Sequence, residues 1–252
     1  MIVYLYDGTF SGLLTAIYEA FYQKEKPGQI MREQNYSQNL FSRPIYISSN
    51  DDKADKVFTA VKNKISSTAL RNVYYAYLSE MDNADTASYC YLKVGFKMGR
   101  YVDGNHSDEN VAKLHEICKK VSTEKHRMLG FIRFRLIERD VFYAPIEPDH
   151  NIITLTAPHF AKRMSDQNWI IHDIKRKTAI VYNRTEWVMA ELEPIQTLPI
   201  DEEEYIYQKI WRTYFDKIAI KERKNPKLQK RFMPSRYWKD LVEMQGDKSD
   251  TF

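Results

Sequence analysis

The densest group of residues able to do chemistry lies between positions 147 and 173. It combines three carboxylates with three histidines: Glu147, Asp149, His150, His159, His172 and Asp173. Imidazole and carboxylate groups can move protons or bind a divalent metal ion. Their spacing matches no established ligand pattern, and a structural role fits the same residues, since an aspartate can cap a helix. Catalysis and structural support therefore both stay open. A divalent metal is the one cofactor this cluster would take, with its ligands unknown.

A second group is basic and lies around the same region. Arg133 and Arg135 alternate with apolar residues, the period of a strand that carries both arginines on one face. Guanidinium groups bind phosphate oxygens in a fork geometry, and Arg163, Lys175 and Arg176 would extend such a surface. The solvated face of a half-buried sheet explains the alternation as well.

The C-terminal quarter carries a stronger basic pattern. From Lys209 to Lys239 there are eleven Lys or Arg and two acids, about +9, in a chain of net charge +4. Cations neutralise phosphates while flat rings stack on unpaired bases. The residues expected to bind nucleic acid in this way are Lys227, Lys230, Arg231, Arg236, Tyr237, Trp238 and Lys239. A charged helix whose rings pack on the core, or a protein interface, would use the same residues.

A third candidate is Asp7, in the turn Asp7-Gly8-Thr9 between an expected strand and an expected helix. Such a junction exposes N–H groups that attract anions, whereas an acid there fits a helix cap better. The sequence has no P-loop, no GxGxxG and no HExxH motif. Its only cysteines, Cys90 and Cys118, cannot hold an iron–sulfur cluster. We therefore expect no Walker-type ATP hydrolysis and no cluster-based radical chemistry within this chain.

The elements that must position these residues follow from hydrophobic periodicity. The expected elements are a strand at 2–6, a helix at 10–23, a strand at 45–47, a helical subregion at 51–129, hairpins at 131–146 and 169–182, a helix at 155–164, a strand at 186–191 and a basic helical C-terminus at 201–243. The pattern predicts an α+β fold: an antiparallel sheet of two hairpins plus the N-terminal strand, a largely helical insertion, and C-terminal helices. We expect one domain over residues 1–252, with its sheet region at 130–192.

One helix near the C-terminus makes a specific packing prediction. Acids at 201–204 begin it, where they offset the helix dipole. Its apolar residues recur at helical spacing and are expected to form a buried stripe: Tyr207, Ile210, Trp211, Tyr214 and Ile218.

Composition sets the compartment. The 252 residues are 43% hydrophobic and 29% charged, as in ordinary globular proteins. Two unpaired cysteines fit a reducing compartment. The N-terminus lacks a basic signal region, and no apolar run approaches the roughly 20 residues that span a bilayer. We expect a cytoplasmic protein with no membrane contact.

Three stretches together resemble an uncharacterised bacterial family of DNA-metabolism proteins. They are Tyr6-Asp7-Gly8-Thr9-Phe10 near the start, Tyr143-Ala144-Pro145-Ile146-Glu147-Pro148-Asp149-His150 with Ala157-Pro158-His159-Phe160 and Trp169-Ile170-Ile171-His172-Asp173 in the middle, and Phe232-Met233-Pro234-Ser235-Arg236-Tyr237-Trp238-Lys239 at the end. The resemblance implies a radical-SAM partner acting in DNA modification or repair. Relatives are fused to uracil-DNA-glycosylase-like domains, and we expect no such domain here.

Three functions are consistent with these observations. The first is an accessory protein that binds DNA and works with the radical-SAM partner. The second is an enzyme acting on DNA or a nucleotide through the carboxylate and histidine cluster. The third is an adaptor that binds a protein and no nucleic acid.

Overall fold

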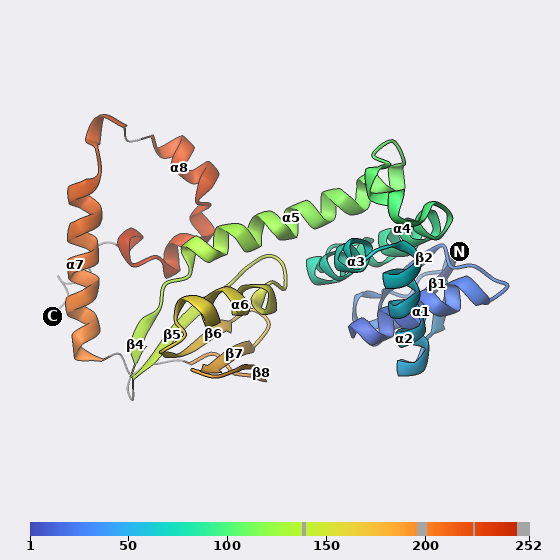
Figure 1. Cartoon of the computed structure of the whole chain (residues 1–252), viewed down its shortest axis with the longest axis horizontal. Coiled ribbons are helices and arrows are strands. Elements are labelled where there is room, and N and C mark those ends of the chain that lie inside the picture. The colour runs from blue at the N-terminus through green and yellow to red at the C-terminus, as the bar shows by residue number, and fades with distance from the viewer. Residues whose placement is uncertain (138–139, 196–200, 224, 246–252) are drawn as a thin grey trace. The chain divides into compact units, whose positions relative to one another are not determined.

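The computed structural model describes residues 1–137, 140–195, 201–223 and 225–245 (Figure 1). The chain forms two compact units, Met1–Ser122 and Thr123–Phe252. The helix α5 (Glu109–Phe131) begins in the first unit and ends in the second. Within the described ranges, no helix combines the length and the apolar character that crossing a bilayer requires.

The first unit is built on a small parallel sheet. Its order is β2-β1-β3, with β1 at Ile2–Tyr6, β2 at Gln29–Arg32 and β3 at Arg43–Tyr46. The central strand β1 is nearly all buried, which matches its β-branched and aromatic sequence. Its helices are α1 (Phe10–Tyr22), α2 (Asp51–Ala60), α3 (Ser67–Ser79), α4 (Ala84–Met98) and the first part of α5, with a π-helical turn at Val61–Ile65 and a 3₁₀ segment at Gly99–Gly104.

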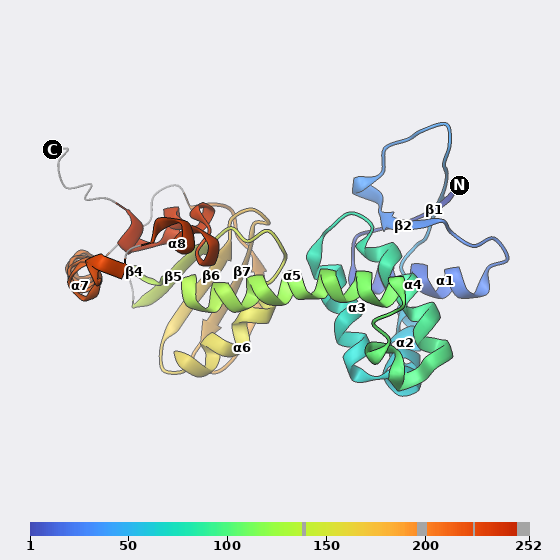
Figure 2. The same cartoon turned by 90° about the horizontal axis from the view of Figure 1, so that it is seen from above.

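The second unit contains a mixed five-stranded sheet of order β4-β5-β6-β7-β8. The strands are β4 (Arg135–Ile137), β5 (Val141–Ile146), β6 (Asn168–Asp173), β7 (Thr178–Asn183) and β8 (Trp187–Glu191). Strands β5 and β6 are parallel, and the other neighbours are antiparallel. The crossover between β5 and β6 contains α6 (Ile153–Arg163), which packs against β6, β7 and β8 (Figures 1 and 2). The buried Trp169 lies on the α6 side and contacts Phe160.

The C-terminal segment completes the second unit. It contains α7 (Glu202–Ile218), α8 (Pro226–Phe232) and 3₁₀ segments at Lys221–Arg223, Ser235–Asp240 and Val242–Met244. The segment Ser235–Asp240 packs against β5. In Figure 1 the chain passes from α7 over to α8 and returns toward the sheet.

The α+β class is confirmed, and the strand arrangement differs from the prediction. The N-terminal strand belongs to a separate parallel sheet, because the helices that follow it build their own core around it. The two predicted hairpins form, and they are joined by the parallel β5–β6 pair. The connection from β5 to β6 crosses over through α6, so the two strands run in the same direction.

Two local predictions were wrong. The strand expected from Phe131 is helix at its start, since α5 extends to Phe131, so Arg133 lies before β4 and shares no strand with Arg135. The stripe of α7 expected to be buried is exposed: Tyr207 is 60%, Ile210 59% and Tyr214 53% accessible. The helix instead faces its own unit with polar residues.

Candidate nucleic-acid interface

A loop that follows β5 is held from two sides by buried charges. The Glu124 carboxylate, 5% exposed on α5, accepts the backbone N–H of Asp149 at 2.9 Å and of His150 at 2.8 Å. Arg176 donates to the carbonyl oxygens of Pro148 at 3.1 Å and Asp149 at 2.8 Å. Both ends of the peptide dipoles are therefore matched by an opposite charge, which makes this loop rigid.

Arg176 is itself fixed by the acid at the end of β6. Its Nη1 donates to Asp173 Oδ2 at 2.8 Å, and the Asp173 side chain is fully buried. A buried carboxylate paired with a guanidinium that also donates to backbone carbonyls satisfies both charges. Asp173 and Arg176 thus act as a support for the loop.

His172 is also buried, and its hydrogen bonds define its tautomer. Nε2 lies 2.9 Å from the Leu192 carbonyl oxygen, which can only accept, so Nε2 carries the proton. Nδ1 then accepts from the Tyr143 hydroxyl at 2.7 Å. Burial lowers the pKa of His172, so the ring stays neutral near pH 7. Both ring nitrogens are engaged within the protein, which is the pattern of a structural histidine.

The closing motif docks onto this same loop. Arg236 pairs with Asp149 at 2.7 Å, and Lys239 pairs with Glu147 at 2.5 Å. The buried Tyr237 hydroxyl donates to Glu124 and accepts from Arg236 at 2.8 Å. Burial and the Glu124 carboxylate raise the pKa of Tyr237, so its hydroxyl stays protonated. The central and closing stretches, about 90 residues apart in the chain, are therefore one ion-paired cluster.

Other predicted phosphate ligands are likewise engaged inside the unit. Arg133 pairs with the Glu243 carboxylate at 2.7 Å. The Trp238 Nε1–H donates to the Met233 carbonyl at 2.9 Å. Arg135 differs, because its Nε is buried and has no hydrogen-bond partner among the described residues. Tyr237, Arg236, Lys239 and Arg133 hold the C-terminal segment in place, a use that the residue types alone do not distinguish from phosphate binding.

The cations of α8 are placed differently. Lys227, Lys230 and Arg231 are exposed, and none of the three forms an ion pair with a described residue. Lys230 lies 6.0 Å from the centre of the Trp238 ring. The adjacent Phe232 is 63% exposed. Uncompensated cations beside an exposed ring are the combination that a nucleic-acid backbone with unpaired bases requires.

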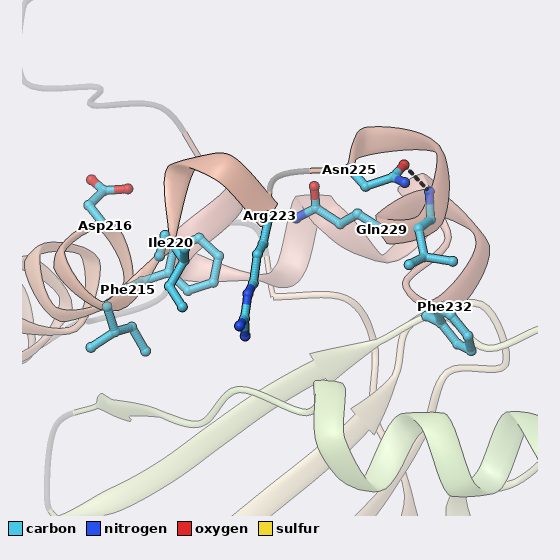
Figure 3. A pocket seen from close by; sticks show the side chains of 10 residues that line it. Phe215, Asp216, Ile220, Arg223, Asn225, Gln229 and Phe232 are labelled. Atoms are coloured by element: carbon cyan, nitrogen blue, oxygen red, sulfur yellow. Dashed lines mark hydrogen bonds between the residues drawn. The ribbon is translucent and has the colours of Figure 1, made fainter.

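The opposite face of α8 lines a groove that it shares with the end of α7. The charged residues that line this groove are Arg223 and Asp216. The groove has a volume of about 720 Å³, with Phe215 and Ile220 on one side and Gln229 and Phe232 on the other. Figure 3 shows the Arg223 side chain extending into the space between these two sides. The helix α8 is capped by Asn225, whose side chain accepts the Leu228 N–H at 3.0 Å (Figure 3). Lys224 lies outside the described residues.

The remaining basic candidates lie apart from the groove. Lys175 is exposed at the β6–β7 turn. Arg163, also exposed, lines a second cleft of about 780 Å³ together with Phe134 and Phe160. Both clefts belong to the second unit.

The six carboxylates and histidines do not share one cleft. Glu147, Asp149 and His150 lie in one loop, and Asp173 supports that loop from below through Arg176. His172 is sealed inside, and His159 is exposed on α6 against the Phe160 ring. Among the described residues, no group of three or more His, Cys, Asp or Glu is arranged to hold a metal ion. The divalent metal stays a prediction.

Asp7 is a structural acid at the end of β1. Its carboxylate accepts the Thr9 N–H at 3.0 Å and the hydroxyls of Thr9 at 2.8 Å and Ser49 at 2.6 Å. Burial raises the pKa of Asp7, and the hydrogen bonds from Ser49 and Thr9 outweigh it and hold the pKa below its ordinary value. Thr9 is the N-cap of α1. The turn Asp7-Gly8-Thr9 therefore has the geometry of a helix cap, the alternative to an anion site.

Two central residues were missed by the sequence analysis. Glu124 and Glu243 lie in expected helical regions, where an acid is usually solvated, and nothing in their spacing distinguishes them. A third group lies in the first unit, where Asp103 accepts from Tyr91 at 2.7 Å and is 3.0 Å from His115 Nε2. Only the fold reveals that the side chains of Glu124 and Glu243 are buried and that Asp103 accepts these contacts.

Fold and site together define an α+β protein of two units whose second unit carries a groove with aromatic walls and a basic helix, α8, beside it. A model of a domain of unknown function, DUF4130, matches residues 82–243. This is more than half of the chain, and the protein belongs to that family. The match contains the central and closing stretches, while the opening stretch at Tyr6–Phe10 lies outside it. No curated protein shows a significant sequence match to the chain.

Proposed function

We propose that the protein is a nucleic-acid-binding accessory protein of DNA metabolism that works with a radical-SAM partner. The observation that carries the nucleic-acid part is the groove between α7 and α8. Its walls include Phe215 and Phe232, with Arg223 between them and Asp216 also among the lining residues. Lys227, Lys230 and Arg231 lie on the remaining surface of α8, and none of them forms an ion pair with a described residue. The radical-SAM partner is supported by the resemblance of the three sequence stretches.

A single strand fits this groove better than a duplex. The walls include the rings of Phe215 and Phe232, and each unpaired base offers a flat face that such rings can cover. Duplex bases are stacked on each other and cannot enter a groove of this kind. The cations of α8 then follow the phosphate backbone.

The distribution of the carboxylates and histidines favours binding over catalysis. A catalytic set must converge on one cleft within hydrogen-bond reach. Here His172 and Asp173 are buried, and Glu147 and Asp149 are paired with Lys239 and Arg236. The cluster supports the segment that carries the groove.

The test is the salt dependence of binding to a short single-stranded DNA. The triple variant Lys227→Ala, Lys230→Ala, Arg231→Ala should bind more weakly, and its log–log salt slope should fall by about 0.7 for each contact removed. A matched control, Lys62→Ala, Lys97→Ala, Lys113→Ala, removes three exposed cations of the first unit and should leave the slope unchanged.

Equal losses in the two triple variants would show that only net charge matters and would remove the groove as the site. Phe232→Ala should weaken single-strand binding by about 1–3 kcal/mol while leaving the slope unchanged, because stacking releases no counterions.

The partner is tested separately, by capture of the radical-SAM protein before and after nuclease treatment. Loss of capture after nuclease would mean that DNA alone bridges the two proteins.

A further inference from the structure

The helix α7 packs on its own unit through polar side chains. Glu204 is its buried residue: Oε2 accepts the Leu136 N–H at 2.9 Å, and Oε1 accepts from Gln208 Nε2 at 2.8 Å. One helical turn after Gln208, the Nε of Arg212 donates to the Val242 carbonyl oxygen at 3.2 Å. These hydrogen bonds fix the rotation of α7 about its own axis.

The same rotation turns the apolar side chains away from the protein. With 3.6 residues per turn, Ile206, Ile210 and Tyr214 lie on the side opposite Glu204. They are 61%, 59% and 53% exposed, respectively. A surface helix of a monomer normally has the opposite orientation. A contiguous apolar face in solvent is typical of a surface that binds another protein.

The charges at the two ends of this face identify the partner. Glu203 and Lys217 lie on the same side as Ile210, seven residues before it and seven after it. Both side chains are exposed. If two copies of α7 pair antiparallel around a two-fold axis at Ile210, Glu203 of each copy meets Lys217 of the other. Ile206 then meets Tyr214, and Ile210 meets its own equivalent.

We propose that the exposed face of α7 binds the same face of a second copy of this chain, antiparallel, to form a two-fold dimer. The face is complementary to itself in this orientation, as an isologous interface must be. Antiparallel pairing also sets the acidic first turn of each helix beside the basic end of the other. Parallel pairing would place Glu203 against Glu203 and Lys217 against Lys217.

This inference does not depend on nucleic-acid binding. The dimer face uses Glu203, Ile206, Ile210, Tyr214 and Lys217, and none of these lines the groove between α7 and α8. The exposed cations of α8 likewise lie outside the dimer face. Failure of the dimer and failure of the proposed function can therefore be observed separately.

The experiment is sedimentation velocity of the full chain over a roughly hundredfold range of concentration, since dimer formation follows mass action. Wild type should move from the monomer mass toward twice that mass. Glu203→Lys and Lys217→Glu should each raise the dimer dissociation constant about tenfold, because each creates two like-charge contacts. The double variant Glu203→Lys, Lys217→Glu should restore the wild-type constant.

Two further variants keep the test independent of folding. Ile210→Asp should be monomeric throughout, with an unchanged circular dichroism spectrum, because its side chain is solvent-exposed in the isolated chain. Leu40→Asp, fully exposed in the first unit, should dimerise as wild type does. Ile210→Cys should form a disulfide-linked dimer on mild oxidation, since the two thiols face each other at the axis.

Three results would overturn the proposal. A wild-type chain that stays monomeric throughout would do so, as would failure of the double charge variant to restore dimerisation. An unchanged dissociation constant in Glu203→Lys would indicate parallel pairing instead, because the substitution would then replace one like-charge contact by another. A monomer that binds the radical-SAM protein or lipid vesicles, and loses that binding in Ile210→Asp, would assign the face to that other partner.

Discussion

Single side chains in the second unit show how the same residue type serves support or binding according to its neighbours. Arg176 forms an ion pair with Asp173, and Arg236 forms one with Asp149. Lys227 and Lys230 have the same charge and no described acid to pair with. The two groups differ in the distance from the cation to the nearest carboxylate. A sequence pattern carries no information about that distance.

At this scale the neutral His172 makes stability depend on pH. Burial holds its pKa in the folded state below the ordinary value of 6.5. The unfolded chain therefore binds a proton first as pH falls. The stabilisation that neutral His172 provides is complete above pH 6.5 and is lost as pH falls toward the folded-state pKa, at up to about 1.4 kcal/mol per pH unit.

The measurement is urea unfolding of wild type and His172→Gln at pH 7 and pH 5, followed by tryptophan fluorescence. All four tryptophans lie in the second unit, so the signal reports that unit alone. The glutamine variant should be less stable at pH 7, and the gap should narrow at pH 5, because only the wild type pays the protonation cost. A gap that is the same at both pH values would contradict a neutral buried imidazole.

At the scale of elements, the start of α1 lies unusually close to the end of β1. Gly12 lies in the first turn of α1, and a Cβ there would overlap the Asp7 carboxylate and lie 2.8 Å from Ser49 Oγ. Asp7 cannot move without losing its hydrogen bonds to Thr9 and Ser49. Glycine at this position therefore allows the cap, the strand end and the helix to coexist.

Gly12→Ala should destabilise this junction by about 2 kcal/mol, within the range for overpacking a tight site. Hydrogen exchange of peptides from β1 and α1 should become about 30-fold faster, provided that they exchange through local opening. Gly104→Ala is the matched control, because a Cβ there meets nothing within 4 Å. Unchanged exchange in Gly12→Ala would mean that Asp7 adapts without cost.

At the scale of the molecule, each unit has its own core. The first is built around Tyr4, Leu13 and Ile17, and the second contains buried Trp169, Ile171 and Ile180. Units with separate cores can unfold in separate transitions. A mutation that destabilises one unit should then leave the unfolding signals of probes in the other unit unchanged.

Glu124→Ala tests this independence. It leaves two backbone N–H groups and the buried Tyr237 hydroxyl without their acceptor, which should cost the second unit about 3 kcal/mol. Tryptophan fluorescence should show the loss, while hydrogen exchange in β1 should stay as in wild type. Tyr237→Phe, which removes one of these bonds, should cost about 1 kcal/mol. Equal destabilisation of β1 by Glu124→Ala would show that the two units unfold together.

The sequence by itself determined most of the elements, because helices and strands follow local periodicity and turn residues. The helical subregion, both hairpins and the acid-capped start of α7 were found in this way. It also identified the central and closing stretches, whose side chains meet through Arg236–Asp149 and Lys239–Glu147. The short strand β2 was missed, since four residues with two buried leave little periodic signal.

Only the tertiary structure decided which way those elements face and which charges are paired. Glu124 and Glu204 look like solvated helix acids in sequence, and each becomes a buried acceptor through contacts made far along the chain. Because Glu204 binds the backbone of β4, α7 turns its apolar stripe outward, against the expectation from amphipathicity. Hydrophobic periodicity reports that a helix has two faces, whereas long-range hydrogen bonds select the face that is buried.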